Sequence, residues 1–316
     1  MMDRWDERIL LVGGSLLAKE KGCLNTCEIL QTKPNCTRKL EVVNSIWNPM
    51  NQCRRAPGLL RLIDEETSRI HVVCVGGCDD NAQLSSVEHF DNMTGQPQWK
   101  QSNCSLSEPR SCSATCSLGD GSALVLGGWT GKGCSTSVDR LMLTNGEVTR
   151  TSLASMTFGL KNSCAVKFND EIYLIGGWDG SRTLDWIYRY DSENGSLSPV
   201  RKLPYPVECH SCVLHEGIVY IVGGFDGISL RSHILTWNCT TDDIDEIGNL
   251  TVPRECHAAS ILKPSQESAV LFIIGGWDGK EALKSVECFN LELNQTTLLQ
   301  SCELLNARNR PSVVVL

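Results

Sequence analysis

Short apolar runs that each end in a pair of glycines recur along the whole chain. The first run is Ile9–Val12 and the last is Leu271–Ile274. Counted from first glycine to first glycine, the intervals are 63, 51, 49, 47 and 52 residues. One such run fits a buried strand of many folds, but six at a nearly constant interval predict a repeat architecture. The glycine pairs are Gly13-Gly14, Gly76-Gly77, Gly127-Gly128, Gly176-Gly177, Gly223-Gly224 and Gly275-Gly276.

The segments between the glycine pairs follow one order. After most pairs come a bulky residue and a turn, as in Trp178-Asp179-Gly180, where glycine accepts a positive φ and aspartate caps its own backbone. An alternating segment such as Ser285–Asn290 follows, and its period of two predicts a strand with one solvated face. A weaker outer strand and a polar entry into the next apolar strand complete the unit. Each unit therefore holds about four short antiparallel strands and no helix, which predicts an all-β fold, a six-bladed β-propeller.

The two ends of the chain predict how the ring of blades closes. Residues 8–14 have the pattern of a second strand with no first strand before it, and residues 308–316 have the pattern of a first strand. Pairing the two completes six blades and covers an apolar edge that would otherwise invite aggregation. The whole chain, 1–316, is then one propeller domain. Blade 1 takes 1–50 with 305–316, and blades 2 to 6 take 51–105, 106–154, 155–203, 204–250 and 251–304.

Composition and charge narrow the class of protein. No apolar run approaches the roughly 20 residues that span a bilayer. The net charge of -8 disfavours nucleic acid and anionic membranes as partners. The charged N-terminus is unlike a secretory signal, so we expect the 17 scattered cysteines to be reduced and the protein to be cytoplasmic. We accordingly interpret the Asn-x-Ser/Thr sequons as accidental, namely Asn35, Asn92, Asn103, Asn194, Asn238, Asn249 and Asn294.

Two features suggest ligand chemistry but have simpler explanations. The glycine pairs lack the following lysine and helix of a phosphate-binding loop, so we interpret them as structural positions where backbones approach closely. Cys209-His210-Ser211-Cys212 is similar to a zinc or redox motif. In an extended strand, however, residues three apart point to opposite faces, so the two sulfur atoms cannot share one ligand. We therefore expect neither a metal nor a cofactor.

The succession of apolar strand, glycine pair, aromatic residue, Asp-Gly turn, Ser-Val-Glu segment and polar strand entry resembles the kelch repeat over the whole chain. It is most similar to the six-bladed kelch domain of BTB-kelch proteins, whose C-terminal strand likewise completes the first blade. This resemblance implies a protein-interaction module, the substrate-recognition part of a cullin-based ubiquitin ligase adaptor. The BTB and BACK regions of that family have no counterpart in residues 1–8, so we expect either a stand-alone propeller or a fragment.

The same resemblance leaves two alternatives. Some kelch proteins associate with actin, so a cytoskeletal binder is the first. The second is a copper enzyme, because galactose oxidase also uses a kelch propeller. That chemistry needs converging tyrosine and histidine ligands, and of the five tyrosines only Tyr205 lies in a connecting segment. Because fold analogy alone does not carry an activity, we expect no enzyme.

Charged residues and histidines recur where the chain leaves an outer strand and enters an inner one. By the blade geometry these entries share one rim of the central channel with the loops that follow the glycine pairs. In kelch-like proteins this rim grips a peptide or loop of the partner, and Arg310 resembles a rim arginine of that family. Guanidinium groups beside aromatic rings would suit an acidic, turn-forming peptide, whereas the alternative is that they satisfy inter-blade carboxylates such as Glu208 and Glu255. The predicted partner-binding residues are Arg55, Arg110, Lys161, Arg182, Glu208, His210, Arg254, His257 and Arg310.

Overall fold

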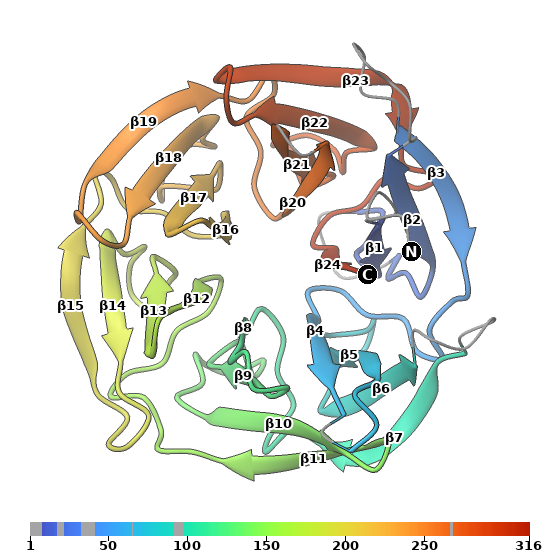
Figure 1. Cartoon of the computed structure of the whole chain (residues 1–316). Coiled ribbons are helices and arrows are strands. Elements are labelled where there is room, and N and C mark those ends of the chain that lie inside the picture. The colour runs from blue at the N-terminus through green and yellow to red at the C-terminus, as the bar shows by residue number, and fades with distance from the viewer. Residues whose placement is uncertain (1–7, 18–21, 33–41, 65, 92–97, 266–267) are drawn as a thin grey trace.

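Six antiparallel sheets stand around a common axis in the computed structural model, which describes residues 8–17, 22–32, 42–64, 66–91, 98–265 and 268–316 (Figure 1). Each sheet has four strands, and its first strand lies nearest the axis. The prediction of an all-β, six-bladed propeller is therefore confirmed. Within the described ranges no helix is long and apolar enough to cross a membrane.

The strands of each blade are given from the axis outwards. Blade 1 contains β24 (Ser312–Val315), β1 (Arg8–Val12), β2 (Cys27–Thr32) and β3 (Val42–Trp47), and blade 2 contains β4 (Gly58–Ile63), β5 (Ile70–Val75), β6 (Ser86–Asp91) and β7 (Lys100–Ser105). Blade 3 contains β8 (Ala114–Ser117), β9 (Ala123–Leu126), β10 (Val138–Thr144) and β11 (Glu147–Ser152), and blade 4 contains β12 (Cys164–Phe168), β13 (Glu171–Ile175), β14 (Trp186–Tyr190) and β15 (Leu197–Lys202). Blade 5 contains β16 (Ser211–His215), β17 (Ile218–Val222), β18 (His233–Asn238) and β19 (Ile244–Asn249), and blade 6 contains β20 (Ala258–Ser265), β21 (Ser268–Ile274), β22 (Ser285–Asn290) and β23 (Gln295–Glu303).

The last strand of the chain completes the first blade. β24 pairs antiparallel with β1, in a register that runs from Ile9 opposite Val315 to Val12 opposite Ser312. The apolar residues of β1 are fully buried between β24 and β2 and against the neighbouring blades. The ring is thus closed by its own two ends, as the sequence predicts (Figure 1).

The glycine pairs lie where one blade meets the next. A Cβ on Gly275 would come within 2.7 Å of the carbonyl oxygen of Arg308, closer than Cβ contacts in proteins. The N–H of Gly276 donates a hydrogen bond to that same oxygen, at 2.8 Å. Both glycines have positive φ, which residues other than glycine rarely adopt. The remaining five pairs make the same contacts, so the glycines are structural, and their recurrence follows from the recurrence of the blade junction.

A buried arginine continues this junction in four of the six blades. The carbonyl of Arg308 accepts the hydrogen bond from Gly276 in blade 6. Its guanidinium donates to residues of blade 1, namely to Thr26 and to the carboxylate of Glu28, the latter at 2.6 Å. Both side chains are at most 1% exposed. A charge-assisted pair of this kind is stable only when its partner groups are all present. The four pairs are Arg54–Glu88, Arg110–Asp139, Arg254–Glu287 and Arg308–Glu28.

Blades 4 and 5 replace the ion pair by apolar residues. Leu160 and Val207 supply the carbonyl groups that accept from the glycine pairs of blades 3 and 4. Tyr188 and Leu235 stand where the other blades have the carboxylate, and all four side chains are buried. The same fold therefore uses two solutions at one position, a buried ion pair and a buried apolar contact.

Two histidines form a buried pair in blade 2. The Nδ1 atoms of His71 and His89 lie 3.3 Å apart, and both side chains are less than 10% exposed. Burial, followed by repulsion from His71, lowers the pKa of His89 below its ordinary value of 6.5. Since the unfolded chain binds that proton more readily, the contribution of His89 to stability is complete above about pH 6.5 and is lost as the pH falls below it.

We therefore expect the melting temperature to fall between pH 7 and pH 5, and to fall less steeply in His89→Gln. Thermal melts followed by circular dichroism at several pH values measure this. A His89→Gln profile as steep as that of the parent chain would contradict this role of the pair.

Candidate functional site

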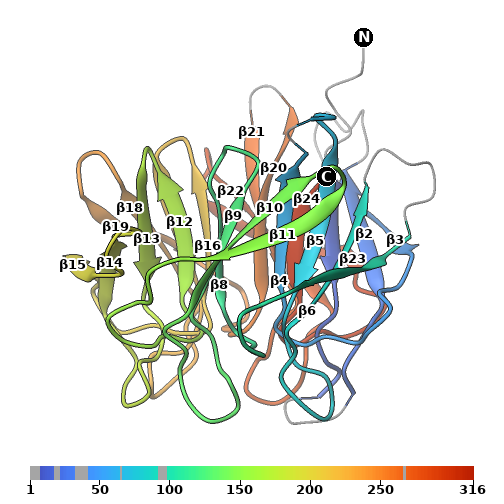
Figure 2. The same cartoon turned by 90° about the horizontal axis from the view of Figure 1, so that it is seen from below.

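Two sets of loops meet on one face of the ring. The segments that enter the inner strands pair by short β-bridges with the loops that follow the glycine pairs, for example Lys161 with Trp178 and Glu255 with Trp277. The inner and second strands of a blade are antiparallel, so the start of one lies beside the end of the other. The C-terminus, at the far end of β24, lies on the opposite face (Figure 2). We call the face that carries both loop sets the entry face.

A closed ring of backbone hydrogen bonds surrounds the axis at the entry face. The N–H of each member donates to the carbonyl of the equivalent residue in the preceding blade, at 2.7–3.1 Å, and Ala56 closes the circle by donating to Arg310. All six members have φ between 50° and 58°. Backbone strain of this kind persists only where the surrounding structure imposes it, here the closure of the propeller. The members of this axial ring are Ala56, Cys112, Asn162, Cys209, Cys256 and Arg310.

The side chains of the axial ring line a cavity of about 140 Å³. A second cavity of about 210 Å³ continues along the inner strands, with Cys164, Cys212 and His257 in its wall. The residues that line the two cavities come from the inner strands of all six blades and the segments that enter them, so the cavities are successive parts of the central channel. No tyrosine lines either cavity in the described part of the chain, so the tyrosine–histidine ligand set of a copper oxidase does not converge there.

Arg310 is the charged member of the axial ring. Its guanidinium donates to Asn162 Oδ1 at 3.0 Å and to the sulfur atoms of Cys112 at 3.2 Å and Cys209 at 3.6 Å. The pKa of Arg310 is raised above its ordinary value, first by the negative charge that the Cys256 sulfur can carry, although burial opposes this. Burial raises the pKa of the neighbouring Glu255, which Arg310 partly offsets. The centre of the entry face is therefore a guanidinium held among thiols.

Aromatic and charged side chains surround this centre. The ammonium group of Lys161 lies 4.6 Å from the ring centroid of Trp129 and 4.5 Å from that of Trp178, so it sits between the tryptophans of two neighbouring blades. A cation held against aromatic faces in this way is a positioned charge rather than a mobile one. Glu208 accepts from Asn162 Nδ2 at 2.7 Å and from Thr183 Oγ1 at 3.0 Å, and is partly exposed.

Two exposed side chains project from the loops after the glycine pairs. The side chain of Arg182 is 74% exposed on the β13–β14 loop. Ile228 is 90% exposed on the β17–β18 loop, directly after the turn formed by Asp226 and Gly227. An isoleucine exposed at a loop tip buries almost no apolar surface, so it adds little to the folding stability of the isolated protein. The sequence analysis placed this loop on the rim but did not list Ile228 among the binding residues; the signal was an apolar residue where the loops of blades 2, 3, 4 and 6 have a polar or charged one.

The structure divides the predicted partner-binding residues into three groups. Arg55, Lys161, Glu208 and Arg310 are partly exposed around the channel mouth, and Arg182 is exposed at a loop tip. His210 and His257 are buried in the channel wall, and burial lowers the pKa of His257 to about 3, so its imidazole is neutral at pH 7. The third group is Arg110 and Arg254.

The prediction was wrong for Arg110 and Arg254. Both are fully buried and bonded to Asp139 and Glu287, so neither can reach a partner. The alternative, that these arginines satisfy carboxylates, holds for them, although the carboxylates differ from Glu208 and Glu255. The structural equivalents of Arg110 and Arg254 are Arg54 in blade 2 and Arg308 in blade 1. Arg54 is one residue before the predicted Arg55, and Arg308 is two residues before the predicted Arg310.

One family model matches two parts of the chain. The model of the Kelch motif matches residues 159–204, which include all four strands of blade 4, and residues 270–295 in blade 6. A comparison with curated proteins gave no match. The four other blades repeat the strand order and glycine pair of the two matched ones. Propellers of this kind are general protein-interaction modules and typically are not enzymes. The matches and the ring of six like sheets together support a kelch-repeat propeller.

Proposed function

We propose that the protein binds a segment of another protein across its entry face. The observation that carries this proposal is the exposed Ile228 at a loop tip, on the same face as the positioned charge of Lys161 and the channel mouth. Exposed apolar side chains rimmed by charged groups are typical of protein interfaces. The buried ion pairs behind this face hold the loops on a rigid scaffold, which lowers the entropy that binding must overcome.

The chemistry of the face indicates the kind of segment that it accepts. Lys161 and Arg182 both belong to blade 4 and offer two cations near Trp178. Arg182 is only loosely paired with Asp179, at 3.9 Å, and so can bind a partner carboxylate. An acidic, turn-forming segment that also presents an apolar side chain to Ile228 fits this arrangement.

We further propose that this contact recruits substrates to a cullin-based ubiquitin ligase in the cytoplasm. The support for this finer statement is the resemblance to BTB-kelch proteins. The cytoplasmic location suits a chain with 17 cysteines and fits a ligase adaptor. The alternative function is association with the cytoskeleton, and the experiment below distinguishes the two.

Affinity purification from a cell lysate, followed by mass spectrometry, tests the proposal. The rim variant combines Lys161→Ala, Arg182→Glu and Ile228→Asp, none of which removes a buried ion pair. We expect it to lose its specific partners by tenfold or more while it keeps the melting temperature of the parent chain. Arg254 is left unchanged, because its loss would destabilise the fold, and a less stable variant would confound a loss of binding.

The matched control is Asp170→Lys, in the exposed turn between β12 and β13 on the opposite face. It should keep all partners. Partners that survive in the rim variant but are lost in the control would overturn the proposed face. Co-purification of a cullin supports the ligase proposal, and cosedimentation with actin filaments supports the cytoskeletal one.

A further inference from the structure

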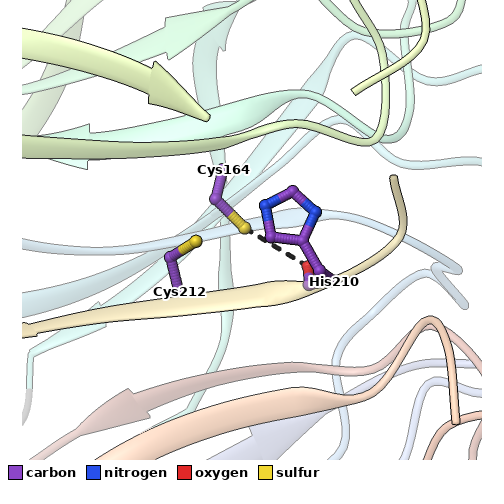
Figure 3. Close-up of side chains that lie close together, drawn as sticks. All are labelled: Cys164, His210 and Cys212. Carbon is purple, nitrogen blue, oxygen red and sulfur yellow. Dashed lines mark hydrogen bonds between the residues drawn. The ribbon is translucent and has the colours of Figure 1, made fainter. Parts of the chain in front are cut away.

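Two cysteines and a histidine converge between blades 4 and 5. The sulfur atoms of Cys164 and Cys212 and a ring nitrogen of His210 lie within 4.8 Å of one another. Figure 3 shows the two sulfur atoms and the imidazole close together, with Cys164 projecting from β12, Cys212 from β16 and His210 from the segment that enters β16. The Sγ of Cys164 donates to the backbone carbonyl of His210 at 3.2 Å.

The strand period explains this convergence. His210 immediately precedes β16 and Cys212 is the second residue of that strand, so the two residues are two apart and their side chains lie on the same side of the chain. Cys209, whose backbone has a positive φ, belongs to a different cluster, with Glu255 and Cys256. The third ligand comes from the inner strand of the neighbouring blade, which no local sequence motif can reveal.

His210 gives independent evidence for a ligand. It is only 6% exposed, and neither of its ring nitrogens has a hydrogen-bond partner among the described residues. A buried imidazole without partners is costly, because it has lost its water and gained nothing in return. A metal ion bound between the imidazole and the two thiols would remove that cost.

The donor set selects the kind of ion. Two thiols and one imidazole are soft and borderline ligands, which suit Zn²⁺ rather than Mg²⁺ or Ca²⁺. Tetrahedral zinc, with bonds of about 2.0–2.3 Å, needs ligand atoms roughly 3.5–3.8 Å apart, so shifts of about 1 Å suffice. Both cysteines line the larger channel cavity, so the fourth position opens onto it.

The second cluster of thiols is a poor alternative for a cation. Cys209 faces the guanidinium of Arg310, at 3.6 Å from a nitrogen atom. That positive charge repels a metal ion, and the cluster's third member is a carboxylate. The proposed site therefore differs from the second cluster in charge as well as in ligands.

The position of the site gives it a structural consequence. It spans the junction between blades 4 and 5, where Val207 stands in place of the buried arginine. We propose that Cys164, His210 and Cys212 bind one Zn²⁺, which joins these two blades and keeps a fourth position open to the channel. A bound ion would stabilise the folded state by mass action.

Zinc binding to the reduced full-length chain tests this inference. We expect about one equivalent of Zn²⁺ to remain after gel filtration, by elemental analysis, and Zn²⁺ to raise the melting temperature. Cys164→Ser and Cys212→Ser should each lower zinc retention tenfold or more and remove the thermal shift. The control Cys256→Ser should retain zinc. No retention by the parent chain, loss in the control alone, or a Cys164–Cys212 disulfide in protein kept under reductant would each overturn the inference.

The repeat itself supplies a gain-of-function variant. His257 is the blade 6 equivalent of His210, and Ser211 and Ala259 stand where the site has Cys164 and Cys212. The equivalence extends to a hydrogen bond, because Ser211 Oγ donates to the His257 carbonyl at 2.7 Å. Ser211→Cys with Ala259→Cys should therefore add a second equivalent of zinc. A folded double variant that still binds only one equivalent would contradict the assigned geometry.

Discussion

Deletion of residues 305–316 is expected to abolish soluble, folded protein. The deletion removes β24, which pairs with Ile9–Val12 of β1, and it removes Arg308, the buried partner of Glu28. Four apolar residues of β1 that are fully buried would face solvent along an unpaired strand edge. Each such side chain contributes about 1.5–3 kcal/mol when buried, so their partial exposure is comparable with the whole stability of a typical domain.

Expression of the truncated chain, gel filtration and thermal melting measure this result. Unpaired apolar edges pair with other chains, so we expect aggregates. A synthetic peptide of residues 305–316, added during refolding, should restore the soluble form because it supplies both the strand and the arginine. A truncated chain that is soluble and melts at the temperature of the parent would refute closure by the terminal strand.

Substitution of one member of a buried ion pair is expected to cost about 3–5 kcal/mol of unfolding free energy. Arg254→Leu leaves Glu287 buried with only the amides of Thr251 and Val252 as partners. Glu287→Ile leaves those amides and the guanidinium of Arg254 without their acceptor. Either change places an uncompensated polar group inside the blade junction.

The double variant Arg254→Leu/Glu287→Ile fills the junction with apolar side chains in place of the ion pair, as blades 4 and 5 do. We expect its cost to be smaller than the sum of the single costs, by about 2 kcal/mol or more, since no buried charge remains. Urea unfolding of the four chains measures this coupling. The control cycle uses the exposed pair Arg189–Glu171, at 3.6 Å, where we expect a coupling below about 1 kcal/mol. Equal couplings in the two cycles would contradict the role assigned to burial.

The fold could be predicted because its signals recur. Each blade junction needs a residue without a Cβ beside an incoming carbonyl, so the glycine pair appears at every repeat. The pairing of β24 with β1 followed from unmatched strand patterns at the two ends. Both inferences rest on backbone geometry, which the repeat imposes whatever its side chains are.

The binding face could be predicted only in part, because it depends on differences of one or two residues in register. Arg54 and Arg55 are adjacent in the sequence, yet the first is fully buried and the second is partly exposed. Arg308 and Arg310 differ in the same way. Successive residues of a strand entry have different surroundings, so residue type alone cannot decide which arginine faces a partner. Aligning the six entries with the acidic positions of the following strands would have separated the buried arginines from the others.

The cysteine–histidine cluster shows a different limit. The spacing of Cys209 and Cys212 correctly indicated that these two sulfur atoms do not meet. The expectation that no metal binds considered ligands within one segment, whereas the cluster takes Cys164 from the neighbouring blade. Only the three-dimensional junction between blades 4 and 5 brings that residue to His210.

Hydrogen–deuterium exchange at the inner strands tests the central claim, a ring of six blades closed by its own ends, most directly. We predict that amides in residues 312–316 exchange as slowly as those of β8 and β12, since they bond to β1, and that the amide of Ala56 is protected by Arg310. Rapid exchange confined to residues 312–316, in a chain whose other inner strands are protected, would show that the ring is open and would contradict the account.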